Sequence, residues 1–207
     1  MLTTAAKYPF FDMLEIIPET TLSYHAFQPL KPAKTGDDIP GFALSSNYER
    51  WQRFYNGGET NSPILLRELL SKPLVIAFYS KHWRNIGLKR LKQLNAAQHE
   101  IKANGGNLLI ISSEKDQELA NAAWNDSLSL DFYFDHNNEI AKKFNVYSDN
   151  DPAWNKFSGI DVNAPLPATY VVNTSKRIVY DHIYLDFSGS FAAADVISAV
   201  YNSALFQ

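Results

Sequence analysis

The clearest pattern in the chain is a switch from continuous apolar residues to an amphipathic spacing. Leu74–Tyr79 is an unbroken apolar run with a β-branched pair and two final aromatic residues, which predicts a buried central strand. Leu88, Leu91 and Leu94 then recur every third residue, with Lys and Arg between them, and this spacing predicts one face of an amphipathic helix. Residues 80–87 are therefore predicted to be a strand-to-helix turn that ends at open helix amides. Such turns are where α/β sheets place their chemistry.

The rest of the chain continues the alternation of strand and helix. Further strands are predicted over residues 107–113, 131–134, 168–173 and 177–184, and residues 42 and 44 show strand alternation. Helices are predicted over residues 64–70, 114–125, 138–145 and 191–205, and residues 147–163 are predicted to be an irregular insertion. This order indicates an α/β fold with a mainly parallel sheet and an antiparallel last pair of strands.

The first part of the chain has a different pattern. Residues 1–35 hold four of the ten prolines and show no clear period, so we expect an N-terminal extension. Its aromatic residues predict that it packs on the domain surface or on a partner subunit, because an unattached tail would carry fewer of them. The sequence thus predicts an extension at 1–35 and one domain over 36–207.

Composition narrows the functional classes. The 207 residues include no cysteine, which excludes disulfides, thiolate catalysis and zinc sites with cysteine ligands. The net charge of −3 and the pI near 5.9 argue against nucleic-acid binding. No run of 18 apolar residues suggests a membrane span, and no secretory signal is recognised at the N-terminus. We therefore expect a cytoplasmic protein that binds neither membranes nor nucleic acids.

Several stretches resemble the peroxiredoxins, the alkyl hydroperoxide reductase and thiol-specific antioxidant family. FYSKHWRNIGLKRL at residues 78–91 is similar to the family's active-site strand, turn and helix. GDDIPGFAL at residues 36–44 is similar to its opening Gly-Asp-x-x-Pro-x-Phe-x-Leu. The resemblance extends over residues 36–204 and implies a thioredoxin-like, peroxiredoxin-type mixed sheet with helices on both faces. APLPATYVV at residues 164–172 is similar to the thioredoxin-fold signature in which a cis-proline precedes a strand, which implies a cis bond between Leu166 and Pro167.

The reactive positions of that family are not retained. By the resemblance, Arg84 occupies the position of the family's Thr or first Cys, and Gly87 occupies the position of the peroxide-reducing cysteine. Ser190 lies about where related sequences carry a supporting arginine. Because glycine offers no nucleophile, the resemblance implies a protein without peroxidase activity, and we expect no catalytic residue at these positions.

Ligand binding at the former active-site turn remains open. The candidate residues are His82, Trp83, Arg84, Asn85 and Pro167. The main hypothesis is a binding or interaction scaffold whose turn side chains only pack. The alternatives are a binder of a small anion or other small molecule at the turn, and an oxidoreductase that acts through a thiol partner. A retained peroxidase would need a different nucleophile.

The position of Arg84 bears on whether the side chains of the turn only pack or bind a ligand. A cation at a helix N-terminus is disfavoured by the helix dipole, and residues 80–87 contain no acid. Arg84 is expected either to pair with a distant carboxylate, such as Asp135 or Asp186, or to form an anion site with the amides of residues 85–87.

Other chemistry is not supported by the sequence. No two of the five histidines have the four-residue spacing of a helical zinc site, and no Gly-x-Ser-x-Gly motif indicates a hydrolase. We expect no metal and no cofactor. The aromatic extension at residues 1–35 offers surface that could be buried against a second copy, and the resemblance implies pairing, so we expect a homodimer.

Overall fold

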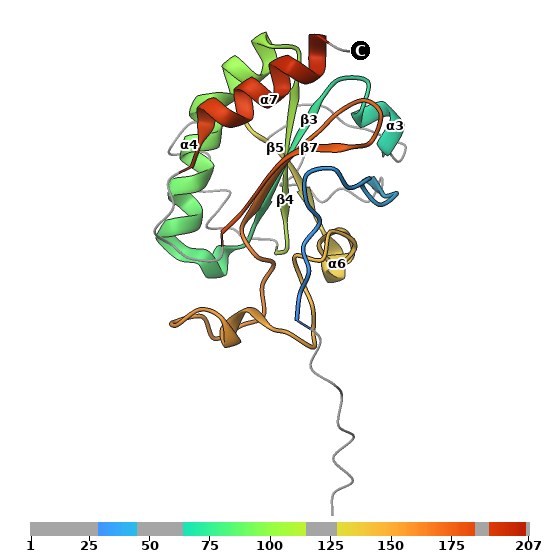
Figure 1. Cartoon of the computed structure of the whole chain (residues 1–207). Coiled ribbons are helices and arrows are strands. Elements are labelled where there is room, and N and C mark those ends of the chain that lie inside the picture. Colours follow the sequence, from blue (N-terminus) through green and yellow to red (C-terminus); the bar gives the residue numbers. More distant parts are fainter. Residues whose placement is uncertain (1–28, 45–63, 115–127, 185–190, 206–207) are drawn as a thin grey trace, which may run out of the picture.

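A five-stranded mixed sheet forms the centre of the molecule. The computed structural model describes residues 29–44, 64–114, 128–184 and 191–205 (Figure 1). Within them the sheet order is β5 (Asp131–Phe134), β4 (Asn107–Ser112), β3 (Leu74–Tyr79), β6 (Ala168–Val172) and β7 (Ile178–Ile183). The strands β3, β4 and β5 are parallel, and β6 pairs antiparallel with both β3 and β7. The buried parallel pair and the antiparallel last pair expected from the sequence are thus confirmed.

Helices cover both faces of this sheet, as the resemblance implied. The helices α4 (Arg84–Ala103) and α7 (Ala193–Leu205) lie together on one face, and α6 (Glu139–Lys143) lies on the other (Figure 1). Alternate residues of β3 supply the two cores, because successive strand side chains point to opposite faces. Val75 and Ala77 pack with α4 and α7, whereas Ile76 packs with α6.

Two predicted helices differ from the observed elements. Residues 64–70 begin as the short strand β2 (Ile64–Leu65), which pairs antiparallel with β1 (Ala43–Leu44), and only then form α3 (Leu66–Leu69). The helix expected over 138–145 is shortened to α6, because Asn138 and Asn145 adopt the left-handed conformation at its ends. The helix predicted over 114–125 lies almost entirely outside the described residues.

The expected cis-proline is wrong. Within the described residues no peptide bond is cis, so Leu166–Pro167 is trans, which is the form that X-Pro bonds favour by about 0.5–1 kcal/mol. The neighbouring backbone is held in this form, since Leu166 N–H donates to Val146 O at 2.7 Å and Pro167 O accepts from Tyr184 N–H at 2.9 Å. The fold assignment rests on the sheet order and does not depend on this bond.

The described end of the N-terminal extension is attached to the domain. Ala33 N–H donates to the carbonyl of Phe144 at 3.0 Å, and Thr35 donates to Asp181 through both its N–H and its hydroxyl. Leu30 packs against the core cluster on the α6 face. Residues 29–35 are therefore held by the domain, while residues 1–28, which make up most of the extension, lie outside the described residues. The boundary at residue 35 stays a prediction.

Candidate functional site

The turn between β3 and α4 is a short 3-10 helix, Lys81–Trp83, followed by the helix start at Arg84. Ser80 begins it in extended conformation, and its hydroxyl accepts from the His82 N–H at 3.2 Å. Arg84 has φ +48° and ψ −134°, a left-handed conformation that a residue with a Cβ rarely adopts. The strand-to-helix turn expected from the sequence is therefore present, and its sharpest backbone strain lies at Arg84.

Trp83 is a packed residue of this turn. It is 3% exposed, and its indole Nε1 donates to the carbonyl of Pro165 at 2.9 Å. Its ring meets Phe157 edge to face, with centroids 5.1 Å apart, a geometry that stabilises aromatic pairs. Trp83 thus joins the turn to the irregular segment around Phe157 and to the chain just before β6.

Gly87, the residue at the family's cysteine position, is enclosed by its neighbours. A Cβ placed on Gly87 would lie 3.0 Å from Tyr79 Cε2, 3.1 Å from Trp83 Cβ and 3.3 Å from the carbonyl oxygen of Ser80. Contacts this short require the neighbours to shift, and buried aromatic side chains on a packed sheet yield little. A side chain at position 87 would therefore fit only if Tyr79 and Trp83 moved by a few tenths of an ångström.

A carboxylate from a neighbouring strand end satisfies the donors of the turn. Glu114, which follows β4, accepts from the Ser80 hydroxyl at 2.8 Å and from the Lys81 N–H at 3.1 Å. His82 Nε2 lies 3.7 Å from the same carboxylate. The sequence showed no acid within residues 80–87, but the parallel pairing of β3 and β4 brings Glu114, 34 residues after Ser80, to the turn. A negative charge here opposes the formation of a thiolate or the binding of an anion at the start of the turn.

Arg84 does not form the expected pair with Asp135. Asp135 is 2% exposed, and its carboxylate accepts from the amides of Ile140 and Ala141, each at 2.9 Å, at the start of α6. Burial raises the pKa of Asp135, while these hydrogen bonds act in the opposite direction. Arg84 and Asn85 are exposed, and within the described residues no ion pair joins Arg84 to an acid.

Two other sequence candidates cannot be placed. Asp186, the second proposed partner of Arg84, and Ser190, at the family's arginine position, both lie outside the described residues. The anion site formed by Arg84 and the amides of residues 85–87 stays a prediction.

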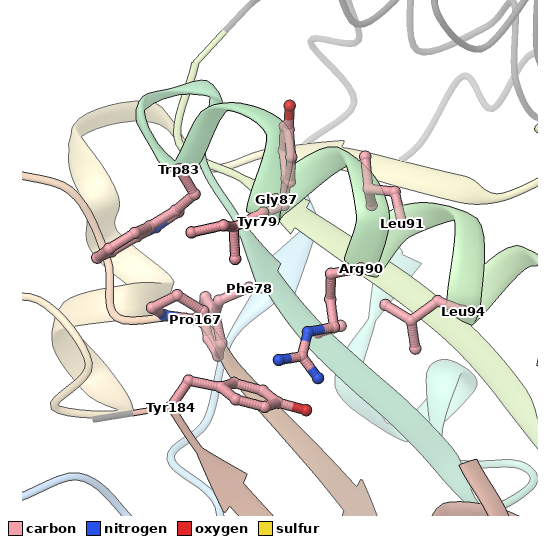
Figure 2. A pocket seen from close by; sticks show the side chains of 11 residues that line it. Phe78, Tyr79, Trp83, Gly87, Arg90, Leu91, Leu94, Pro167 and Tyr184 are labelled. Atoms are coloured by element: carbon pink, nitrogen blue, oxygen red, sulfur yellow. The ribbon is translucent and has the colours of Figure 1, made fainter. Parts of the chain in front are cut away.

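A residue that the sequence did not single out, Arg90, lies one helical turn beyond Gly87. Figure 2 shows it reaching from α4 over Tyr184, where its guanidinium carbon lies 3.2 Å from the ring centroid. Burial lowers the pKa of Arg90 from its ordinary value, although an arginine remains charged at neutral pH. Burial also raises the pKa of Tyr184 to about 12, while the charge of Arg90 lowers it.

Arg90 and Tyr184 line a small cavity between α4 and the sheet. Its volume is about 20 Å³, and its walls are mostly apolar, with Phe78, Trp83, Ile86 and Pro167 among them (Figure 2). Of the candidate residues, Trp83 and Pro167 line the cavity, whereas His82, Arg84 and Asn85 do not. Arg90 could not be distinguished in the sequence, because it lies between Lys89 and Lys92. This group of basic residues is typical of the solvent-exposed side of a helix.

Neither a metal site nor a membrane-spanning helix is found in the described parts of the chain. No group of three or more His, Asp or Glu side chains among them could hold a metal ion. No helix there is both long and apolar enough to cross a bilayer.

Comparisons with known proteins support the resemblance. The family model described as AhpC/TSA matches residues 35–181, and a search of curated proteins gave no match. Similar solved structures include the peroxidoxin BcpB from Mycobacterium tuberculosis, with 19% identity, a TM-score of 0.59 and coverage of 82% of this chain and 97% of that one.

Two further solved structures lie in the same range of similarity. The bacterioferritin comigratory protein of Xanthomonas campestris has 18% identity and a TM-score of 0.59, with 81% of this chain and 99% of that chain covered. AhpC of Mycobacterium tuberculosis has 15% identity and a TM-score of 0.56, with 82% and 92% covered. At these identities the structures support the thioredoxin-like, peroxiredoxin-type fold alone. The match of the family model to more than half of the sequence shows that the chain belongs to the AhpC/TSA family.

Proposed function

We propose that this chain is a binding or interaction scaffold of the AhpC/TSA family without peroxidase activity. The observation that carries the proposal is the environment of Gly87. The chain has no cysteine at all, and a Cβ added at position 87 would come within 3.1 Å of both Tyr79 and Trp83. The absence of a nucleophile together with this tight packing supports a role that does not use the family's thiol chemistry.

The carboxylate of Glu114 supports the same proposal. Peroxide reduction in this family needs a thiolate, and a thiolate is stabilised by a helix N-terminus and by nearby cations. Here an acid accepts the hydrogen bonds of Ser80 and Lys81 and lies 3.7 Å from His82 Nε2, so its charge offsets part of the positive charge of the turn. The polar groups of the turn are thus used in hydrogen bonds within the protein.

The experiment that tests this proposal is peroxide consumption by the purified chain with a thiol reductant. The wild-type protein and Gly87→Cys are compared with Gly87→Ala, which adds the same Cβ without a thiol. We expect no turnover by the wild type and no more turnover by Gly87→Cys than by Gly87→Ala. Turnover by the wild type that survives removal of trace metals, or a fast peroxidase from the single Gly87→Cys change, would overturn the proposal.

A second candidate function is binding of a small molecule beside the former active-site turn. The cavity next to Trp83 and Pro167 favours it, since enclosed apolar spaces with a few polar groups are typical ligand sites. This role is compatible with the first, because it also needs no nucleophile.

We also propose a homodimer in the cytoplasm. The exposed large hydrophobic residues Trp154 and Val162, at 48% and 44% exposure, support a contact surface on the irregular segment 147–163. Sedimentation at micromolar concentration tests this assembly. A monomer would contradict it.

A further inference from the structure

The guanidinium of Arg90 is a partly buried cation without a full set of partners. Its Nη1 atom is buried and has no hydrogen-bond partner. Stacking on Tyr184 and, at 5.7 Å, on Phe191 stabilises the charge through the ring faces, but it leaves the in-plane N–H donors of Nη1 unsatisfied. A buried donor that carries charge is costly in free energy when it is unpaired. A hydrogen-bond acceptor at Nη1 would therefore stabilise Arg90 in this position.

No acid of the described chain provides that acceptor. Among the described residues no carboxylate forms an ion pair with Arg90. Asp181, on β7, already accepts two hydrogen bonds from Thr35, and Asp195 at the start of α7 is exposed. The positive charge of Arg90 is therefore not neutralised by these elements.

A second unsatisfied donor borders the same space. The hydroxyl of Tyr184 is buried and makes no hydrogen bond of good geometry, although Arg90 and Thr169 lie close enough to lower the pKa of this phenol, and Tyr184 is 4% exposed. Both side chains line the cavity of about 20 Å³ between α4 and the sheet. Such a space admits a group of about the size of one water molecule. An anionic group bound there would place one oxygen between the guanidinium and the phenol and leave the rest of the molecule at the exposed rim.

From this geometry we propose that the cavity binds the carboxylate of a short apolar acid, held by Arg90 Nη1 and the Tyr184 hydroxyl. The apolar walls and the side chain of Ile86, which lines the cavity and is 42% exposed, suit a short hydrocarbon substituent on that carboxylate. A strongly hydrated dianion such as phosphate or sulfate fits these walls poorly, because most of its oxygens would lose their hydrogen bonds to water. This inference deepens the second candidate function above and rests on it.

Titration of the full chain with formate, acetate and butyrate at constant ionic strength tests the proposal. The readouts are the melting temperature and the NMR chemical shifts of residues 84–94, with sodium chloride as the reference salt. We expect saturable shifts, and an affinity that rises from formate to butyrate by up to about fourfold for each methylene that is buried.

Four variants assign the site. Arg90→Met keeps the side-chain length without the charge and is expected to weaken butyrate binding at least about tenfold, whereas Tyr184→Phe keeps the stacked ring and is expected to weaken it less. Arg67→Met, on the exposed face of α3, is the charge-matched control and is expected to bind as the wild type does. Arg84→Met tests the competing site at the turn.

Each outcome decides the matter. Saturable carboxylate binding that is lost in Arg90→Met and retained in Arg67→Met and Arg84→Met supports the proposal. Binding lost in Arg84→Met alone overturns it and moves the ligand to the turn, as does an absence of binding altogether or an equal response to chloride. If Arg90→Met fails to fold, the result for Tyr184→Phe decides, since that change leaves the ring in place. None of these outcomes depends on peroxide turnover, so the scaffold proposal stands or fails separately.

Discussion

Gly87, in the turn, and Arg90, in the cavity, lie three residues apart on the same helix. The polar groups of the turn have hydrogen-bond partners, whereas those of the cavity lack them. At the turn, Glu114 accepts from Ser80 and Lys81, and the side-chain space at Gly87 is filled. In the cavity, the Nη1 of Arg90 and the hydroxyl of Tyr184 are buried without hydrogen-bond partners. The two regions adjoin, because Gly87, Tyr79 and Trp83 also line the cavity. The polar groups of the turn are hydrogen-bonded, whereas those of Arg90 and Tyr184, one helical turn further along, lack such partners.

This difference indicates that a chain can lose the catalytic residue of its family and still keep a cavity beside that position. At the turn a Cβ added to Gly87 would lie only 3.0–3.3 Å from its neighbours, so little space is left for a side chain. An uncompensated buried donor costs free energy and therefore needs an explanation, such as a bound water or ligand. The contrast between satisfied and unsatisfied groups thus supports the proposal that the cavity, rather than the turn, binds a ligand.

The largest expected effect is on the free energy of unfolding and concerns the turn around Trp83. Trp83→Ala should lower the free energy of unfolding by about 3–5 kcal/mol, since it removes a buried indole and leaves a cavity. Chemical denaturation measures this loss. Ile86→Ala, in the exposed rim of the same cavity, should change stability by no more than about 0.5 kcal/mol. If Trp83→Ala stays within about 1 kcal/mol of the wild type, the turn is not the packed element described above.

A smaller effect of opposite sign is expected at Arg84. The φ of +48° suits glycine, so Arg84→Gly should relieve strain and raise the free energy of unfolding by about 1 kcal/mol. Lys89→Gly, at an exposed position inside the same helix, should instead cost about 1 kcal/mol. Equal destabilisation by the two changes, measured in parallel denaturant titrations, would mean that Arg84 is not strained and that the turn has an ordinary helix start.

The sequence predicted the fold well because the relevant signals are local. The run Leu74–Tyr79 and the leucine spacing after it fix the buried strand and the helix, and these determine where the turn lies. The family's positions could be followed by counting along this turn. The trans bond before Pro167 was missed because the signature was taken from the wider fold, whereas the bond itself depends on backbone contacts with Val146 and Tyr184.

The site could be predicted only in part, because its decisive contacts join distant segments. Glu114 reaches the turn through the register of β3 and β4, and Arg90 meets Tyr184 only after β7 has been placed beside β6. Within its own helix, Arg90 is one of several basic residues and has no distinguishing neighbour. Burial of a charge is a property of the tertiary structure, which no local pattern records.

The central claim, that the family's reactive position is closed here, is tested most directly by the pKa of a single thiol at that position. Because the chain has no other cysteine, the pH dependence of alkylation of Gly87→Cys reports this thiol alone. Gly41→Cys, where an added Cβ meets nothing within 4 Å, provides the reference, with an ordinary pKa of about 8.5. A melting curve of each variant confirms that the folded protein is measured.

We predict slow alkylation of Gly87→Cys, with a pKa above that of Gly41→Cys, because burial and the nearby carboxylate both disfavour the thiolate. Adding Glu114→Gln should lower the pKa of this thiol. A thiol at position 87 that is alkylated as rapidly as the reference, with a pKa below about 7 as in activated cysteines, would contradict the account.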